Sequence, residues 1–134
     1  MVEGKVYVDS RHPLSALTGR IIAAAQEVHR TLGPGFREVI YQRALARELP
    51  AHDLEYAREV WMDIIYKGVK IGRKRVDFVV GDGSGDVMVE IKAKASLEDV
   101  DFVQTLSYLK ASGCRVGLLI NFGSKRVQIK RPVN

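Results

Sequence analysis

Two short segments of the sequence hold the residue types that metal-assisted hydrolysis requires. Asp77 lies within an apolar run, and Glu90, Ile91 and Lys92 end a second apolar run that follows a glycine-rich stretch. Because side chains alternate between the two faces of a strand, Glu90 and Lys92 share one face, and a hairpin can bring Asp77 beside them. Carboxylates bind hard divalent cations, and such a cation activates water. This grouping therefore indicates a site for metal-dependent chemistry.

The same charged residues also have a purely structural interpretation. Asp77 can form a salt bridge with Arg75 or Lys92, or lie on a solvated face of the sheet, and Lys92 can be one of many surface lysines. An aspartate is disfavoured within a strand and costly to bury without a partner, so its position needs a reason under either interpretation. The spacing alone does not choose between the two.

Three further residues are candidates for the same site, and each has an ordinary structural role as its alternative. Glu38 falls in the first turn of a predicted helix, where the helix dipole favours a carboxylate in any protein. Gln104 and Tyr108 lie four residues apart in another predicted helix, so they share a face, which is also the pattern of a polar flank. His29, near the end of the first predicted helix, is interpreted as structural.

A cluster of basic residues follows the predicted turn at Lys67 and Gly68. Five of the nine positions from 67 to 75 are basic, and they include Arg73 and Lys74. Such a ridge can track the phosphates of a nucleic acid. Lysines that protect an exposed strand edge give the same pattern, so both interpretations stay open.

Hydrophobic periodicity predicts an α/β protein with a mixed sheet. The connection from strand 86–93 through a helix to strand 116–120 implies that these two strands are parallel. The predicted helices span about 18–32, 37–49 and 96–112, and the predicted strands span 55–66, 69–80, 86–93, 116–120 and 125–130.

Helix boundaries are predicted from capping residues. Thr18 is the expected N-cap of the first helix, although a start near Leu14 is the alternative. Ser96 and Asp99 resemble a capping box at the start of the last helix. The apolar stripe predicted for that helix consists of Val100, Val103, Leu106 and Leu109.

The bulk composition limits the class of protein. The chain has 134 residues, of which 46% are hydrophobic and 28% charged. These values are typical of one globular domain, which we assign to residues 17–134 after a lead-in of residues 1–16. A net charge of +5 permits binding to a polyanion without establishing it. The single cysteine, Cys114, excludes an internal disulfide framework and favours a cytoplasmic setting. We expect neither a signal peptide nor a membrane span.

The segment Gly35-Phe36-Arg37-Glu38-Val39-Ile40-Tyr41 matches the signature of the small prokaryotic GxxExxY proteins, which are placed in the PD-(D/E)XK nuclease-like superfamily. The chain resembles this family in further blocks, in the family's order, and several ordered blocks are more specific than any one of them. These blocks are Ile21–His29, Leu32–Gly35, Tyr66–Gly72, Val76–Phe78, Val89–Ala93, Gln104–Lys110 and Gly117–Gly123.

The resemblance implies a restriction-endonuclease-like fold, with a central mixed β-sheet flanked by helices and a site at one end of the central hairpin. It implies that Asp77 and Glu90 bind Mg²⁺ or Mn²⁺, together with the Ile91 carbonyl. Glu38 matches the helical glutamate that can complete the metal shell, and Lys92 matches the superfamily's lysine. All four side chains are therefore expected to be catalytic.

Other roles follow from the same resemblance. Gln104 and Tyr108 are similar to the Gln-xxx-Tyr element of RecB-like nucleases, which orients the site or contacts DNA. We expect Tyr41 and the basic residues Arg73 and Lys74 to contact nucleic acid or to orient the site.

These expectations lead to two main hypotheses of different classes. The first is a metal-dependent nuclease that hydrolyses DNA phosphodiester bonds, with RNA left open as a substrate. The second is a non-catalytic nucleic-acid-binding or assembly module that keeps the nuclease fold, and a third, weaker one is a metal site that only stabilises the structure. Because a 134-residue nuclease has little surface for gripping DNA, a homodimer or a partner subunit is plausible under either main hypothesis.

Overall fold

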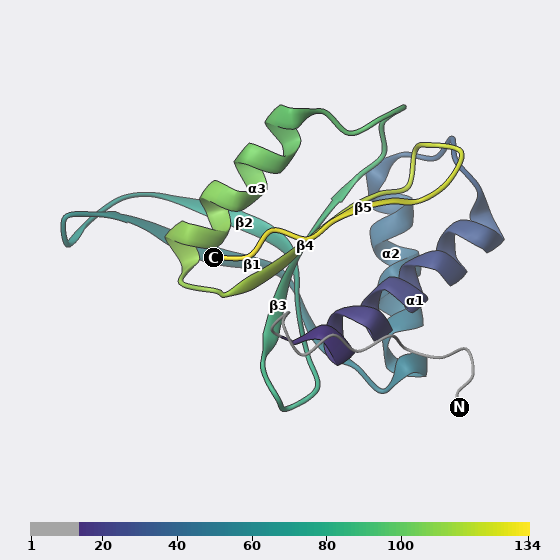
Figure 1. Cartoon of the computed structure of the whole chain (residues 1–134), viewed down its shortest axis with the longest axis horizontal. Coiled ribbons are helices and arrows are strands. Elements are labelled where there is room, and N and C mark those ends of the chain that lie inside the picture. The colour runs from purple at the N-terminus through teal and green to yellow at the C-terminus, as the bar shows by residue number, and fades with distance from the viewer. Residues whose placement is uncertain (1–13) are drawn as a thin grey trace.

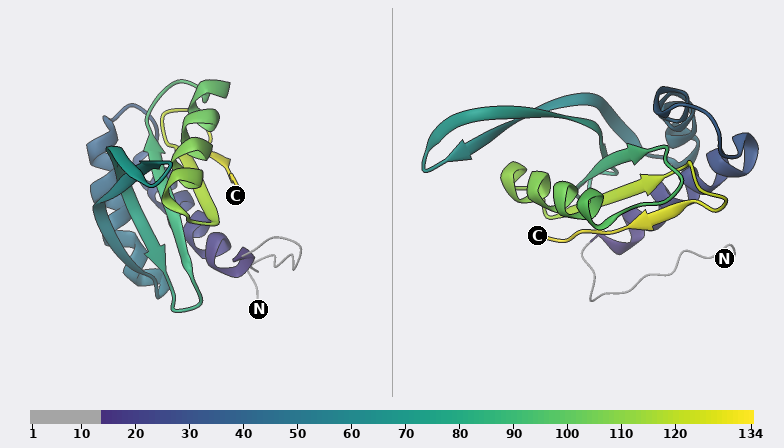
Figure 2. Two further views of the ribbon diagram at one scale, coloured as in Figure 1. Left: turned by 90° about the vertical axis from the view of Figure 1, so that its left-hand side faces the viewer. Right: turned by 90° about the horizontal axis from the view of Figure 1, so that it is seen from above.

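The computed structural model describes residues 14–134, so residues 1–13 of the predicted lead-in lie outside the described part of the chain. A five-stranded mixed sheet in the order β1-β2-β3-β4-β5 has helices on both faces (Figure 1, Figure 2), which confirms the predicted α/β architecture. The elements are α1 (Ser15–Leu32), α2 (Glu38–Glu48), the 3₁₀ turn η1 (Leu49–His52), β1 (Glu55–Tyr66), β2 (Val69–Gly81), β3 (Asp86–Lys92), α3 (Asp99–Ser112), β4 (Val116–Asn121) and β5 (Gln128–Lys130).

One pair of neighbouring strands is parallel, and the others are antiparallel. β3 and β4 run in the same direction, with Glu90 opposite Leu119 and Lys92 opposite Asn121. This arrangement is possible because α3 carries the chain back to the starting end of the sheet. The parallel pairing predicted from the strand–helix–strand pattern is therefore confirmed. It places the end of β3 that carries Glu90 and Lys92 beside the end of β4.

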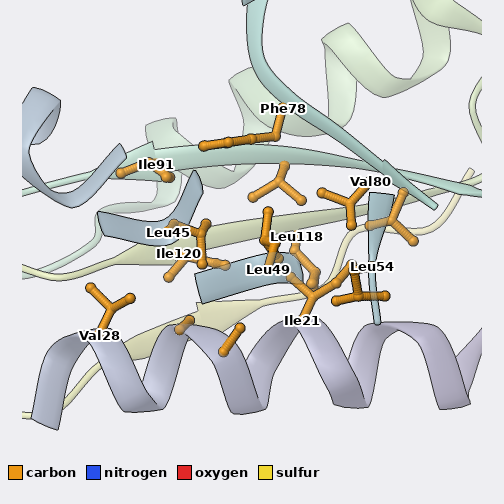
Figure 3. Packing of buried hydrophobic residues seen from close by; sticks show 14 of the residues in the cluster. Ile21, Val28, Leu45, Leu49, Leu54, Phe78, Val80, Ile91, Leu118 and Ile120 are labelled. Atoms are coloured by element: carbon orange, nitrogen blue, oxygen red, sulfur yellow. The ribbon is translucent and has the colours of Figure 1, made fainter. Parts of the chain in front are cut away.

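The main hydrophobic core lies between the sheet and the helices α1 and α2 (Figure 3). Helix α1 buries residues that recur every three or four positions, among them Ile21 and Val28, as expected for a helix with one apolar face. Alternate residues of β3 and β4, such as Ile91 and Ile120, pack against them. Among the helices of residues 14–134, none combines the length and apolar character that crossing a membrane requires.

Helix α1 begins at Ser15, at the earlier of the two predicted starts. The residue before it, Leu14, has a left-handed backbone conformation with φ 57°. The prediction of Thr18 as the N-cap is therefore wrong. Thr18 lies inside the first turn, where its hydroxyl donates to the Ser15 carbonyl at 3.1 Å, a common way for a threonine to satisfy its side chain within a helix.

The capping box of α3 is formed by residues other than the predicted ones. Glu98 is the N-cap, and its backbone N–H donates to Oδ2 of Asp101 at 2.8 Å. The prediction of Ser96 and Asp99 was therefore two residues too early. Asp101 also binds the ammonium of Lys94 at 2.8 Å, so this carboxylate is compensated although it is buried.

Helix α3 consequently turns a different face toward the sheet. Its buried residues are Asp101, Thr105 and Leu109, each four positions after the last. Of the predicted apolar stripe, Leu106 and Leu109 pack in the cluster on this face of the sheet, whereas Val100 and Val103 are exposed. Because the Lys94–Asp101 pair anchors the polar residue inward, the helix is rotated away from the orientation that hydrophobicity alone predicts.

Within the long hairpin of β1 and β2, the side of the sheet toward which alternate residues of β2 point changes at Asp77. Val76 packs in the cluster under α3, whereas Phe78, two residues later, belongs to the core under α1 and α2. Residues two apart share a face in a regular strand, so β2 twists sharply between them. Glu59, on β1 at this level, has a left-handed φ of 54°, and the cross-strand ladder skips this position. The irregularity turns the Asp77 side chain toward α2 and β3.

Tyr41 holds the segment that joins α1 to α2. Gly33 and Gly35 have φ values of 69° and 115°, which glycine adopts without strain. The Tyr41 hydroxyl donates to the Gly33 carbonyl at 2.6 Å and accepts from the Phe36 N–H at 3.2 Å, and its ring stacks on that of Phe122. Complete burial excludes contact between Tyr41 and a nucleic acid, one of the two roles predicted for it. Its position orients the first turn of α2.

Replacing Tyr41 with Phe should lower the free energy of unfolding by about 1–2 kcal/mol, because the ring still packs while two hydrogen bonds to the loop are lost. Urea denaturation followed by circular dichroism measures the change. Tyr66→Phe, at the exposed tip of the hairpin, is the control and should stay within about 0.5 kcal/mol of the parent. Equal stability of Tyr41→Phe and the parent would show that the loop does not depend on this hydroxyl.

Candidate functional site

β2 and β3 separate at Asp77, and two carboxylates replace the ladder at that point. The last ladder pair joins Phe78 to Val89. One residue further, the Asp77 N–H donates to Oε1 of Glu90 at 3.0 Å, and the Ile91 N–H donates to Oδ2 of Asp77 at 2.8 Å. Because a buried N–H needs an acceptor, the two side chains satisfy donors that the diverging strands release. This exchange brings together the predicted residues Asp77, Glu90 and Ile91.

The other two carboxylate oxygens have partners from outside this exchange. Gln42 of α2 donates from Nε2 to Oδ1 of Asp77 at 3.0 Å. The ammonium of Lys74 lies 3.5 Å from Oε2 of Glu90 and 5.0 Å from the centre of the Tyr108 ring. Only 6% of Glu90 is exposed, so its charge depends on such a partner. Helices α2 and α3 and the hairpin therefore meet at this carboxylate pair.

Burial disfavours the ionised form of three carboxyl groups, and repulsion adds to this effect at two of them. Burial raises the pKa of Asp77, against the charges of Lys74 and Lys92. Burial also raises the pKa of Glu90, and the negative charge of Asp77 adds to the effect. The pKa of Glu38 is raised by burial first and by Asp77 second, while Lys92 and Lys74 oppose the shift. Asp77 therefore lies within electrostatic reach of Glu90, Glu38 and Lys92, the other predicted catalytic residues.

The carboxylates as they lie do not form a ready-made cage for an ion. Within residues 14–134, no three side chains of Asp, Glu, His or Cys are grouped closely enough to hold a metal. The chemistry of the donors nevertheless fits a hard divalent cation, which prefers carboxylate and carbonyl oxygens. A cation would also relieve the repulsion that raises the pKa of Glu90 and Glu38. An ion bound here would share the carboxylate oxygens with Gln42 and Lys74, because each oxygen has more than one lone pair.

The remaining predicted residues lie at different places around the pair. Tyr108 is half-buried, and the Lys74 ammonium lies over its ring. Gln104, one turn earlier on α3, is exposed. Arg73 lies on the opposite face of β2 from Lys74, with its guanidinium 4.0 Å from the centre of the Trp61 ring. The two predicted basic residues therefore have different surroundings. Lys74 contacts the site, whereas Arg73 contacts Trp61 on the projecting part of the hairpin.

Two contacts in the site were not predicted. Gln42 lies four residues after Glu38 and shares its face of α2, so helical spacing was a usable signal. The contact between Lys74 and Glu90 had no such signal, because it depends on the twist of β2 at Asp77.

Asn121 holds the chain just beyond Lys92. Its Oδ1 accepts from the N–H groups of Lys94 at 2.9 Å and Gly123 at 3.1 Å. Its Nδ2 donates to the Lys94 carbonyl at 2.9 Å and to Oε1 of Gln128 at 3.0 Å, so the buried amide is fully satisfied. A side chain at Gly123 would overlap the backbone of Lys94. This close packing fixes the end of β3 that carries Glu90 and Lys92.

The raised pKa of Asp77 leads to a prediction about stability and pH. The folded protein keeps a proton on a group of raised pKa after the unfolded chain has lost it, so ionisation costs stability. This cost is absent below the unfolded pKa of about 4 and grows as the pH rises through the folded pKa. In the presence of a chelator, Asp77→Asn should therefore melt at a higher temperature than the parent at pH 7, and the difference should vanish near pH 4.

Thermal unfolding followed by circular dichroism across this pH range tests the prediction. Asp63→Asn, which changes an exposed carboxylate, is the matched control and should show no such gain. If Asp77→Asn melts below the parent at every pH, the hydrogen bonds of the carboxylate outweigh the cost of its charge, and the prediction is wrong.

Comparison with known proteins places this chain in a known superfamily. Residues 15–132 match the profile of a family described as the PD-(D/E)XK nuclease superfamily. A solved structure entitled "Crystal structure of SSO0001" superposes with a TM-score of 0.54 at 17% sequence identity, over 72% of this chain and 50% of that chain, a likeness of fold alone. A search of curated proteins gave no significant match. Because the family profile extends over most of its length, the chain belongs to the PD-(D/E)XK nuclease superfamily.

Proposed function

We propose that this chain is a metal-dependent nuclease that hydrolyses phosphodiester bonds of DNA. The observation that carries the proposal is the pairing of Asp77 with Glu90, with Lys74 and Lys92 within electrostatic reach. Membership of a nuclease superfamily supports it. Buried carboxylates next to ammonium groups are the parts that cation-assisted attack on a phosphate requires.

The proposed cofactor is Mg²⁺ or Mn²⁺. Asp77, Glu90 and the carbonyl of Ile91 would hold the ion, with Glu38 as a further oxygen ligand, directly or through water. When bound, such an ion lowers the pKa of water and neutralises charge on the phosphate.

The surrounding residues have separate proposed roles. Lys92 would position the attacking water or stabilise the negative charge that develops on the phosphate. Gln42 holds one oxygen of Asp77 and so sets the orientation of that carboxylate. Lys74 could exchange Glu90 for a phosphate of the substrate, and Gln104 and Tyr108 would orient the site or contact the nucleic acid.

Several finer assignments form part of this proposal. They are membership of the GxxExxY family within the superfamily, a single domain over residues 17–134, a cytoplasmic location, and action as a homodimer or with a partner subunit. DNA is the proposed substrate, and RNA is the alternative that a cleavage assay on both would distinguish.

A second candidate is a non-catalytic nucleic-acid-binding or assembly module. One observation favours it, because each oxygen of Asp77 and Glu90 already has a partner within the chain. A carboxylate pair of this kind has hydrogen-bond or ion-pair partners on every oxygen without an ion. The module hypothesis predicts DNA binding in chelator and no cleavage in Mn²⁺.

Substitutions at the site distinguish these candidates. Under the nuclease hypothesis, Glu90→Gln and Lys92→Met should each slow cleavage by at least about 100-fold, because the first removes a proposed metal ligand and the second removes a charge that acts on the reacting phosphate. Lys92→Arg should also be slow, since a guanidinium does not replace a compact ammonium. Single-turnover assays on linear, circular and single-stranded DNA in Mg²⁺ and Mn²⁺ measure the rates.

Metal titration by calorimetry separates the roles of the two residues. Glu90→Gln should bind Mn²⁺ more weakly, whereas Lys92→Met should bind it as the parent does, because lysine is not a ligand. Lys125→Met, which removes an exposed lysine on a loop, is the control for loss of charge. Cleavage at the parental rate by Lys92→Met would remove Lys92 from the mechanism. A parent that binds DNA but cleaves none of the substrates would favour the module.

A further inference from the structure

The part of the hairpin beyond Asp77, residues 60–75, projects from the body of the protein, and we call it the β-arm (Figure 1, Figure 2). One face of the β-arm lies against α3, where Val60 and Met62 contact the cluster around Leu109. The other face carries Trp61 opposite Arg75, and Asp63 opposite Arg73. Directly opposed residues of an antiparallel pair share a face, so these four side chains lie together on the face that α3 does not cover.

Exposed apolar side chains are concentrated on the β-arm. Trp61 is 52% exposed, Tyr66 58% and Ile71 64%, and Ile65 and Val69 are comparably open. These five account for half of the large hydrophobic residues that are exposed within residues 14–134. An apolar surface of this kind on a folded protein indicates a binding partner.

The charge of the β-arm identifies the class of partner. Residues 60–75 contain five basic residues and one acidic residue, a net charge of +4. Two such arms repel each other, which disfavours a contact between copies of this chain through the β-arm, whereas a polyanion is attracted. The partner must therefore offer negative charge together with apolar or aromatic surface.

Pairs of cationic and aromatic side chains restrict the class of partner further. The guanidinium of Arg73 lies 4.0 Å from the centre of the Trp61 ring, and that of Arg75 lies 5.7 Å from it. At the tip, the Lys67 ammonium lies 5.4 Å from the centre of the Tyr66 ring. A nucleotide with an unpaired base matches both halves of such a pair, because the base stacks on the ring and the phosphate pairs with the cation. Bases in a duplex are already stacked and do not offer their faces.

The β-arm is continuous with the candidate site. Arg75, which is paired with Trp61 on the face that α3 does not cover, precedes Asp77 by two residues on β2. A strand bound along that face would therefore end close to the carboxylate pair.

We propose that the β-arm binds an unpaired stretch of nucleic acid, with bases stacked on Trp61 and Tyr66 and phosphates paired with Lys67 and Arg73, and guides it to the Asp77–Glu90 pair. This inference rests on the proposed function only in taking a nucleic acid as the ligand. It does not require that the chain cleaves what it binds.

Trp61 is the only tryptophan of the chain, so its fluorescence reports on the β-arm directly. In EDTA, titration with a single-stranded oligo(dT) should quench the emission of Trp61 to saturation. A blunt duplex of the same length should bind at least about 10-fold more weakly in the same titration, because its bases are not available for stacking. Equal binding of both forms, or oligo(dT) binding that leaves Trp61 emission unchanged, would overturn the proposal.

Substitutions test the stacking contact and the phosphate contact separately, and the fluorescence anisotropy of a labelled oligo(dT) measures the binding of each variant. Trp61→Ala should weaken binding by about 10-fold or more through lost stacking. Arg73→Ala should reduce the slope of log affinity against log salt by about 0.7, the value for one phosphate contact to a single strand. Val103→Ala and Arg47→Ala, which change an exposed apolar and an exposed basic residue on α3 and α2, should bind as the parent does.

The outcomes separate this inference from its rivals. Circular dichroism confirms that each variant is folded. If sedimentation shows a dimer that Trp61→Ala dissociates while oligo(dT) binding is unchanged, the β-arm is an interface between copies and the proposal fails. Because all binding is measured in chelator, quenching without later cleavage in Mn²⁺ would overturn the nuclease proposal alone. Cleavage without quenching would overturn this inference alone.

Discussion

The structure depends on how β2 and β3 end their pairing at Asp77. Strands that diverge inside a protein leave backbone donors that must find acceptors away from water. Here Asp77 and Glu90 accept from the backbone of the opposite strand, at 2.8 Å to the Ile91 N–H and 3.0 Å to the Asp77 N–H. The acidic residues are therefore part of the hydrogen bonding of the sheet as well as the candidate site. The hairpin leaves the plane of the sheet at this point because side chains have replaced the ladder.

Two buried acids at one point require compensation, and the neighbouring elements provide it. Lys74 approaches Glu90 from the hairpin, and Gln42 approaches Asp77 from α2. The position of α2 depends in turn on the buried Tyr41 hydroxyl and the glycines before it. On the other side, Asn121 makes four hydrogen bonds, two of which join it to Lys94 just beyond the end of β3. The site is thus assembled from every layer of the fold, although its central residues come from two strands.

The sequence was sufficient for features that depend on local pattern. Runs of alternating residues, and a continuous apolar run for β4, located β1 to β4 closely, and the strand–helix–strand spacing predicted the parallel pairing of β3 and β4. Features that depend on pairing of polar side chains or on strand twist were missed. Asp101 lies on the buried side of α3 with Lys94 as its partner, which hydrophobic spacing does not encode, so the prediction failed for Val100 and Val103 although it held for Leu109. The contact of Lys74 with Glu90 requires a change of strand face that regular alternation excludes.

The position of β1 at the end of the strand order has a consequence for the behaviour of the protein in solution. β1 is a strand of 12 residues whose outer backbone groups face no further strand within residues 14–134. Such an edge is a template for β-aggregation, above all with Trp61 and Ile65 beside it. The left-handed residue Glu59 interrupts the edge, and Asp63 adds a charge farther along it. The twist that shapes the site therefore also serves as protection against assembly into fibrils.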